Sequence, residues 1–197
     1  MKGRIDSLMI SKISDEIISL YEIYGEESYD GEPVTQMSHM IQAAMLAMED
    51  GDIEITLGCF LHDIGHLLKN VPNIQMMGGF GVKDHESIGA AYLKKRGFSD
   101  RILAVVSMHV SAKRYLVATD PQYAEKLSEA SKETLKWQGG PMTSEEINSF
   151  RQHVFFDDII KVRLWDEKAK SYNIPLLPLS YFKNILKYHL ENNILYG

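Results

Sequence analysis

Apolar side chains recur every three to four positions along most of the chain, which is the spacing of one face of a helix. Residues 3–24 show it first, with Ile5, Leu8, Met9, Ile13, Ile17, Leu20 and Tyr24. The same spacing predicts helices at about 35–50, 52–69, 84–97, 99–111, 121–138, 143–152, 155–171 and 178–192. No segment alternates with period two and is rich in β-branched residues, so strands should be few. The pattern predicts an all-α helical bundle.

Three of these helices begin at residues that can cap them. Thr143 with Glu146 matches a capping box, in which each side chain binds a free amide of the first turn. Asp120 precedes Pro121, whose missing N–H is harmless in the first turn. Ser99 is a further N-cap. These signals support the predicted starts.

Residues 70–83, rich in Asn and Gly, interrupt the helical pattern. They lie between two groups of candidate ligands. The segment is therefore either a loop over a functional site or a plain connector.

Length and composition favour one globular domain spanning residues 1–197, with 45% apolar and 24% charged residues. No apolar stretch reaches the roughly 20 residues that span a bilayer, and the amphipathic start is unlike a secretory signal. The single cysteine, Cys59, cannot form an intrachain disulfide, which fits a cytoplasmic protein. The net charge of −6 argues against nucleic-acid binding but permits a small anionic substrate. Membrane attachment is not expected, because the sequence shows no lipidation motif and no basic amphipathic helix.

The densest chemical signal is the run from Cys59 to His66, in which an apolar helix ends in His62 and Asp63. Adjacent side chains on a helix point about 100° apart, so His62 and Asp63 cannot chelate one metal ion without a ligand from another element. A carboxylate can also hold two cations, one on each oxygen, so Asp63 is suited to bridge two metal ions.

Four further side chains on other predicted elements complete a set of six candidate metal ligands: His39, His85, His109 and Asp166. Imidazole and carboxylate ligands suit iron, manganese or zinc, whereas a structural zinc site would use thiolates. His66 is expected to donate to substrate or support the ligands. His153 and His189 lie among charged residues and are expected to be solvated.

From these residues, the chain resembles the mixed-valent di-iron oxygenases of the HD superfamily that cleave carbon–phosphorus bonds. The resemblance covers residues 29–193. Besides the candidate ligands it rests on five runs: Tyr29-x-Gly-Glu32, Met77-Gly-Gly-x-Gly-Val82, His109-Val-x-Ala-Lys-Arg-Tyr-Leu116, Gln138-Gly-Gly-Pro-Met142 and Trp165-Asp-Glu-Lys168. The fold it implies is the HD-domain helical bundle.

The resemblance implies two iron ions in the Fe(II)/Fe(III) state. One iron would take four ligands, and the second would take two more besides the bridging carboxylate of Asp63. The first set is His39, His62, Asp63 and Asp166, and the second pair is His85 and His109.

The resemblance also assigns the substrate site. Tyr29 would occupy the second iron at rest and withdraw when substrate binds, and Glu32 would receive an ammonium group. Lys113, His66 and Ser131 would hold a phosphonate. The implied reaction is O2-dependent cleavage of a 1-hydroxyphosphonate, with (R)-2-amino-1-hydroxyethylphosphonate giving glycine and phosphate as the expected case.

Two other functions fit parts of the pattern. The same ligands with two redox-inert ions would suit a phosphohydrolase acting on a small phosphate ester, although a hydrolase has no need of a displaceable tyrosine. A non-enzymatic sensor of a phosphorylated ligand is less consistent with a complete ligand set. Ser38, Met108 and Pro33 depart from the family pattern near the site, which bears on substrate choice more than on reaction type.

Overall fold

The computed structural model describes residues 6–29 and 31–193. Within them the backbone forms helices and two isolated β-bridges, Ser28–Thr35 and Met76–Val82. The predicted all-α fold is therefore confirmed. In the described part of the chain, no helix is both long and apolar enough to span a membrane. The elements in order are α1 Ser7–Tyr24, α2 Gln36–Ala47, η1 Met48–Asp50, α3 Ile53–Leu61, η2 Ile64–Leu67, α4 His85–Lys94, α5 Asp100–Thr119, α6 Pro121–Lys126, α7 Glu129–Trp137, α8 Ser144–Phe150, α9 Phe156–Lys168 and α10 Leu179–Asn193.

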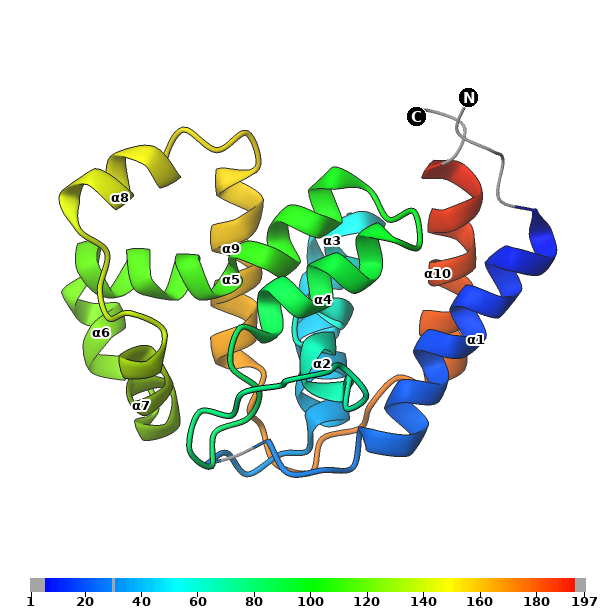
Figure 1. The fold of residues 1–197 in the computed structure, drawn as a ribbon, viewed down its shortest axis with the longest axis horizontal. Coiled ribbons are helices and arrows are strands. Elements are labelled where there is room, and N and C mark those ends of the chain that lie inside the picture. The colour runs from blue at the N-terminus through cyan, green and yellow to red at the C-terminus, as the bar shows by residue number, and fades with distance from the viewer. Residues whose placement is uncertain (1–5, 30, 194–197) are drawn as a thin grey trace.

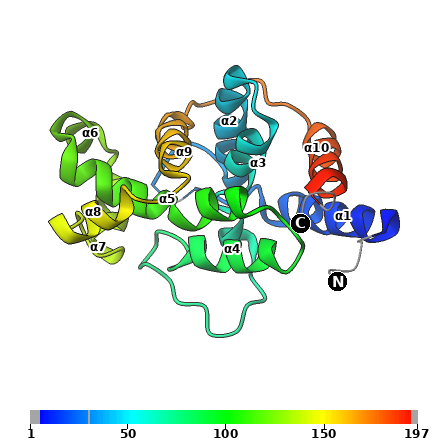
Figure 2. The same cartoon turned by 90° about the horizontal axis from the view of Figure 1, so that it is seen from above.

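The helices form a central group with one smaller group at each end (Figures 1 and 2). In the centre, α3 packs against α2, α5 and α9, and α4 packs against α5 and η2. Helices α1 and α10 pair at one end, while α6, α7 and α8 gather at the other. The candidate ligands come from the central group.

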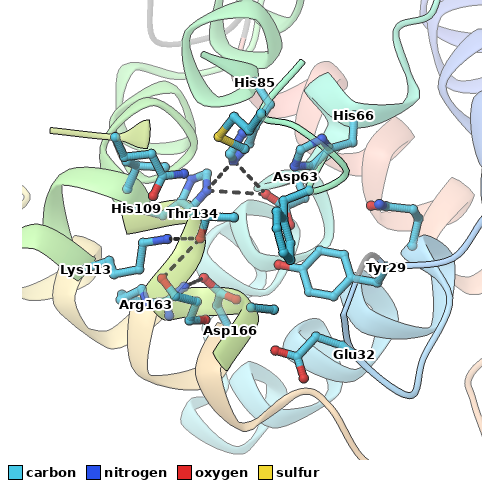
Figure 3. A pocket seen from close by; sticks show the side chains of 17 residues that line it. Tyr29, Glu32, Asp63, His66, His85, His109, Lys113, Thr134, Arg163 and Asp166 are labelled. Carbon is cyan, nitrogen blue, oxygen red and sulfur yellow. Dashed lines mark hydrogen bonds and ion pairs between the residues drawn. The ribbon is translucent and has the colours of Figure 1, made fainter. Parts of the chain in front are cut away.

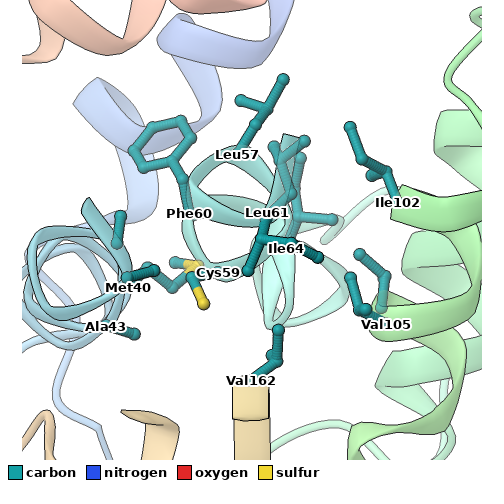
Figure 4. Close-up of a cluster of buried hydrophobic side chains, with 14 of the residues drawn as sticks. Met40, Ala43, Leu57, Cys59, Phe60, Leu61, Ile64, Ile102, Val105 and Val162 are labelled. Carbon is teal, nitrogen blue, oxygen red and sulfur yellow. The ribbon is translucent and has the colours of Figure 1, made fainter. Parts of the chain in front are cut away.

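Helix α3 forms the middle of the hydrophobic core. Every residue from Ile55 to Leu61 is buried, as expected for a helix that is apolar on all sides. Figure 4 shows its side chains between Met40 on α2, Val105 on α5 and Val162 on α9. This packing holds the carboxyl end of α3, where the His-Asp pair lies, against its neighbours.

An aromatic stack attaches the end pair to this core. The Phe60 ring stacks on Tyr21 of α1 at 4.3 Å between centroids and on Phe182 of α10 at 4.2 Å. The Tyr21 hydroxyl also donates to the Phe60 carbonyl oxygen. Rings of this size contribute large buried apolar areas, so the stack fixes α1 and α10 to α3.

The predicted caps are confirmed, but three helix boundaries are wrong. The capping box and the caps at Ser99 and Asp120 all form. The helix predicted at 52–69 ends at Leu61 and is followed by the short helix η2, in which Gly65 lies directly against the α4 backbone. The helix predicted at 99–111 continues to Thr119. The helix predicted at 121–138 breaks before Ser128, which caps α7.

The prediction that His189 is solvated is also wrong. Its side chain is buried, and its ring stacks on Phe98 at 5.4 Å between centroids. Sequence neighbours are charged, but the face of α10 that carries His189 packs inward. His153 is partly exposed, and its Nδ1 accepts a hydrogen bond from the Phe155 amide.

Candidate metal centre

The six candidate ligands converge from five segments of the central group. His39 lies in α2, which is capped by Thr35, and Asp166 lies near the end of α9. His62 and Asp63 follow the last residue of α3. The remaining two are at the start of α4 and in the middle of α5: His85 and His109. All six side chains are buried.

Asp63 lies between two pairs of histidines, and Figure 3 shows it beside the second pair, His85 and His109. Its Oδ2 atom is 3.3 Å from His62 Nε2 and 3.6 Å from His39 Nε2. Its Oδ1 atom is 3.1 Å from His85 Nε2 and 3.3 Å from His109 Nε2. Each carboxylate oxygen therefore faces its own pair of imidazoles, as a bridging ligand would. Asp166 Oδ1 joins the first pair, at 3.2 Å from His39 Nε2.

The imidazoles are oriented for binding cations. Each Nδ1 lies 2.7–3.1 Å from a backbone carbonyl oxygen, to which only a protonated nitrogen can donate. When the rings are neutral, this bond leaves a lone pair on each Nε2, and the Nε2 atoms lie 3.2 Å apart in the first pair and 3.0 Å apart in the second. Two such nitrogens can share a cation, and Asp166 Oδ1 beside the first pair is buried without a hydrogen-bond partner. The donor set thus fits two metal ions.

The charges at the site also favour cations. Burial would raise the pKa of Asp63, but His62 and hydrogen bonds from the surrounding imidazoles hold it well below its usual range. Burial would likewise raise the pKa of Asp166, but the Arg163 guanidinium and His39 keep it low. Both carboxylates are therefore ionised and ready to bind a metal.

His66 lies beside the second pair. Its ring stacks on His85 at 4.0 Å between centroids, and its Nδ1 accepts a hydrogen bond from the Val82 amide at 3.1 Å. Burial and the neighbouring His85 lower its pKa well below the usual range, so the ring is neutral. The proton of a neutral ring with an acceptor Nδ1 is on Nε2, which gives His66 a donor beside the cavity.

A cavity of about 50 Å³ opens beside the carboxylates. Tyr29 lines it, with its ring stacked on His39 at 4.1 Å between centroids. Burial, followed by the charges of Asp63 and Asp166, raises the pKa of the Tyr29 hydroxyl well above its usual range. Met77 and Phe80 of the irregular segment also line the cavity, which favours its interpretation as a loop over the site.

A lysine and hydroxyl groups line one side of the cavity. The Lys113 side chain, one turn after His109 on α5, is buried, and its Nζ donates to Thr134 Oγ1 at 2.9 Å. Burial and the neighbouring Arg163 lower the pKa of Lys113 to about 7. Ser131 lies one turn before Thr134 on α7 and is also buried. A bound anion would favour the charged form of Lys113 and return its pKa toward the usual value.

Glu32 lies on the other side of the cavity, on the loop after α1, near Tyr29 (Figure 3). Its Oε1 atom is 2.9 Å from Lys170 Nζ and accepts a hydrogen bond from Ser128 Oγ at 2.5 Å. Cationic and anionic groups thus face a small polar cavity from opposite sides. This arrangement suits a small ligand with an anionic and a polar or cationic end.

The structure brings all eleven predicted site residues together and adds two that the sequence analysis missed. Arg163, three residues before Asp166, forms ion pairs with Asp166 and Glu167. Its spacing on the helix was the available signal. Lys170 forms ion pairs with Glu32 and Glu167, and its pairing with distant Glu32 had no sequence signal.

Comparisons with known proteins agree with this geometry. Residues 37–147 match the family model of the HD domain. The chain is 41% identical over 175 residues to [1-hydroxy-2-(trimethylamino)ethyl]phosphonate dioxygenase (glycine-betaine-forming) of Leisingera caerulea, covering 86% of each chain. It is 35% identical over 195 residues to hydroxymethylphosphonate dioxygenase of Gimesia maris, covering 95% of each. An uncharacterised protein of Acanthamoeba polyphaga mimivirus is 41% identical over 178 residues, 90% of this chain and 81% of that protein. Since the family model spans more than half of its length, the chain belongs to the HD-domain family.

Proposed function

We propose that this protein is a di-iron oxygenase that cleaves the carbon–phosphorus bond of a 1-hydroxyphosphonate. The proposed substrate is (R)-2-amino-1-hydroxyethylphosphonate, and the products are glycine and phosphate. One O2 supplies both added oxygen atoms, and the substrate supplies all the electrons, so atoms and charge balance without another reductant. The relatives named as dioxygenases of a trimethylammonium and a hydroxymethyl phosphonate support this reaction class.

The observation that carries the proposal is the position of Asp63 between two pairs of imidazoles. Six neutral-nitrogen and carboxylate ligands without thiolates suit iron. Two iron ions bound there would supply the activation of O2 and the redox chemistry of the cleavage. The protein would provide binding, orientation and exclusion of water.

The phosphonate would bind on the side of Lys113. Lys113 would donate to the phosphonate oxygens with a full charge, and His66 Nε2–H would donate without one. Ser131 also lines the cavity, and its hydroxyl would donate to the phosphonate as well. Met77 and Phe80 would cover the bound substrate and keep bulk water away from it.

The opposite end of the substrate would lie against Glu32. In the described part of the chain both side-chain partners of Glu32 bind Oε1, which leaves Oε2 for a substrate ammonium group. Tyr29 lies between this end and the carboxylates, stacked on His39. Its high pKa keeps the hydroxyl protonated in the metal-free site. We propose that Tyr29 gates the site and moves when substrate enters.

The first test is the release of phosphate and glycine from the proposed substrate by iron-loaded protein, with and without O2. We expect stoichiometric release only with O2. Release from a generic phosphate ester without O2, by protein loaded with manganese or zinc, would instead establish the phosphohydrolase. Tight binding of a phosphorylated ligand without any turnover would establish the sensor.

The gating role is tested with Tyr29→Phe, which keeps the ring and removes the hydroxyl. If the hydroxyl protects the site, iron-loaded Tyr29→Phe consumes O2 in the absence of substrate, as an oxygen electrode would show. Tyr24→Phe, on the preceding helix α1, is the matched control. Equal O2 consumption by wild type and Tyr29→Phe would contradict gating.

A further inference from the structure

A nearly buried ion pair lies at the end of the cavity where the proposed function places the substrate's end group. The side chains of Lys170 and Glu32 are 12% and 8% exposed, and Nζ lies 2.9 Å from Oε1. Glu32 lines the cavity, so the carboxylate proposed to attract an ammonium group is already neutralised by the protein's own ammonium. Any cationic end group therefore has to compete with Lys170 for Glu32.

Lys170 also has other partners. Its Nζ lies 2.9 Å from Glu167 Oε1 and donates to the hydroxyls of Ser128 at 3.2 Å and Ser131 at 3.3 Å. Because these groups surround the ammonium, Lys170 can keep a carboxylate partner when a ligand takes Glu32. The other oxygen of Glu167, Oε2, is held by Arg163. The ion pair with Glu32 is thus the one that a ligand can replace.

We propose that Lys170 determines specificity by setting the preference between cationic and uncharged end groups. With Lys170 in place, Glu32 carries little net negative potential, and small phosphonates without an amine are tolerated. Without Lys170, Glu32 would be a buried carboxylate with no counter-charge, which strongly attracts a cation. This inference rests on the proposed function, because it takes Glu32 as the residue that meets the end group.

Binding of two analogues that differ in one charged group tests the proposal without turnover. The probes are 2-aminoethylphosphonate and ethylphosphonate, titrated into iron-loaded protein without O2 and followed by calorimetry. In Lys170→Met, which retains the length of the side chain, we expect the ratio of affinities to shift toward the amine by at least about tenfold. Lys170→Arg keeps the charge and should leave the ratio near that of wild type. Lys168→Met, an exposed lysine of α9, is the matched control.

Turnover gives a second measurement. The ratio of kcat/KM for (R)-2-amino-1-hydroxyethylphosphonate over hydroxymethylphosphonate should rise in Lys170→Met and fall in Glu32→Gln. If Lys170→Met folds, binds iron and keeps the wild-type ratios, or if wild type binds neither analogue, the specificity role is wrong. If Lys170→Met does not fold, Lys170→Gln is measured instead, and the same ratios decide. Failure of the proposed function is seen separately, as no O2-dependent phosphate release by wild type from either hydroxyphosphonate.

Discussion

Replacing Arg163 by Met tests whether a buried cation holds Asp166 in place. The Arg163 side chain is 4% exposed and forms ion pairs with both Asp166 and Glu167. Its Nε also donates to the Tyr123 hydroxyl at 2.7 Å. Met fills a similar volume but leaves two carboxylates and a hydroxyl without this partner, in surroundings that water reaches poorly.

The expected loss follows from burial. Removing one partner of a buried ion pair destabilises a protein by about 3–5 kcal/mol. For a chain of this length, that corresponds to a fall in Tm of about 6–20 °C. Arg101→Met is the control, because Arg101 also pairs with carboxylates, Asp52 at 2.8 Å, Asp158 at 2.7 Å and Glu54 at 3.5 Å, but is 27% exposed. Water screens a partly exposed ion pair, so the loss in Arg101→Met should be smaller than the loss in Arg163→Met.

Thermal unfolding of the metal-free proteins, followed by circular dichroism, gives the loss of Tm in each of the two variants without a contribution from bound metal. Iron content after reconstitution gives the functional consequence. Loss of the Arg163 charge should raise the pKa of Asp166 and weaken iron binding at the first set of ligands, whereas Arg101→Met should bind iron as wild type does. Equal losses of Tm in the two variants would refute the argument that burial decides the magnitude.

Three further predictions concern other parts of the structure. Metal at a free concentration 1,000 times its Kd would stabilise the folded protein by about 4 kcal/mol, so removing it with a chelator should lower Tm and adding iron back should restore it. An unchanged Tm would argue against a metal site. Gly65→Ala would place a Cβ 2.0 Å from the His85 carbonyl oxygen, so α4 must shift and the iron bound per chain should fall. Gly79→Ala is the control and should bind iron as wild type does, because the space around Gly79 is open. Burial lowers the pKa of His189, so the folded state binds fewer protons than the unfolded state, and stability is lost as the pH falls below about 6.5. His189→Gln should flatten this loss, which is at most about 1.4 kcal/mol per pH unit, in urea titrations between pH 5 and 7; an unchanged pH dependence would mean that another group is responsible.

Local features of the sequence were sufficient for the helical fold and for the candidate ligands. Helical spacing of apolar residues and the caps at Ser99, Asp120 and Thr143 depend on contacts within a few residues, so they can be recognised along the chain. The His62-Asp63 pair at the end of an apolar helix can likewise be recognised from a few neighbouring residues. The sequence therefore predicted the helices, many of their starts and which side chains could bind metal.

Contacts between distant segments were decided only by the tertiary structure. The sequence did not show that Lys170 pairs with Glu32 or that His189 is buried on Phe98. These features depend on how the helices pack, because burial changes the free energy of a charge by far more than its sequence neighbours do. Sequence periodicity gives the face of a helix on which a residue lies. Only packing determines what that face meets.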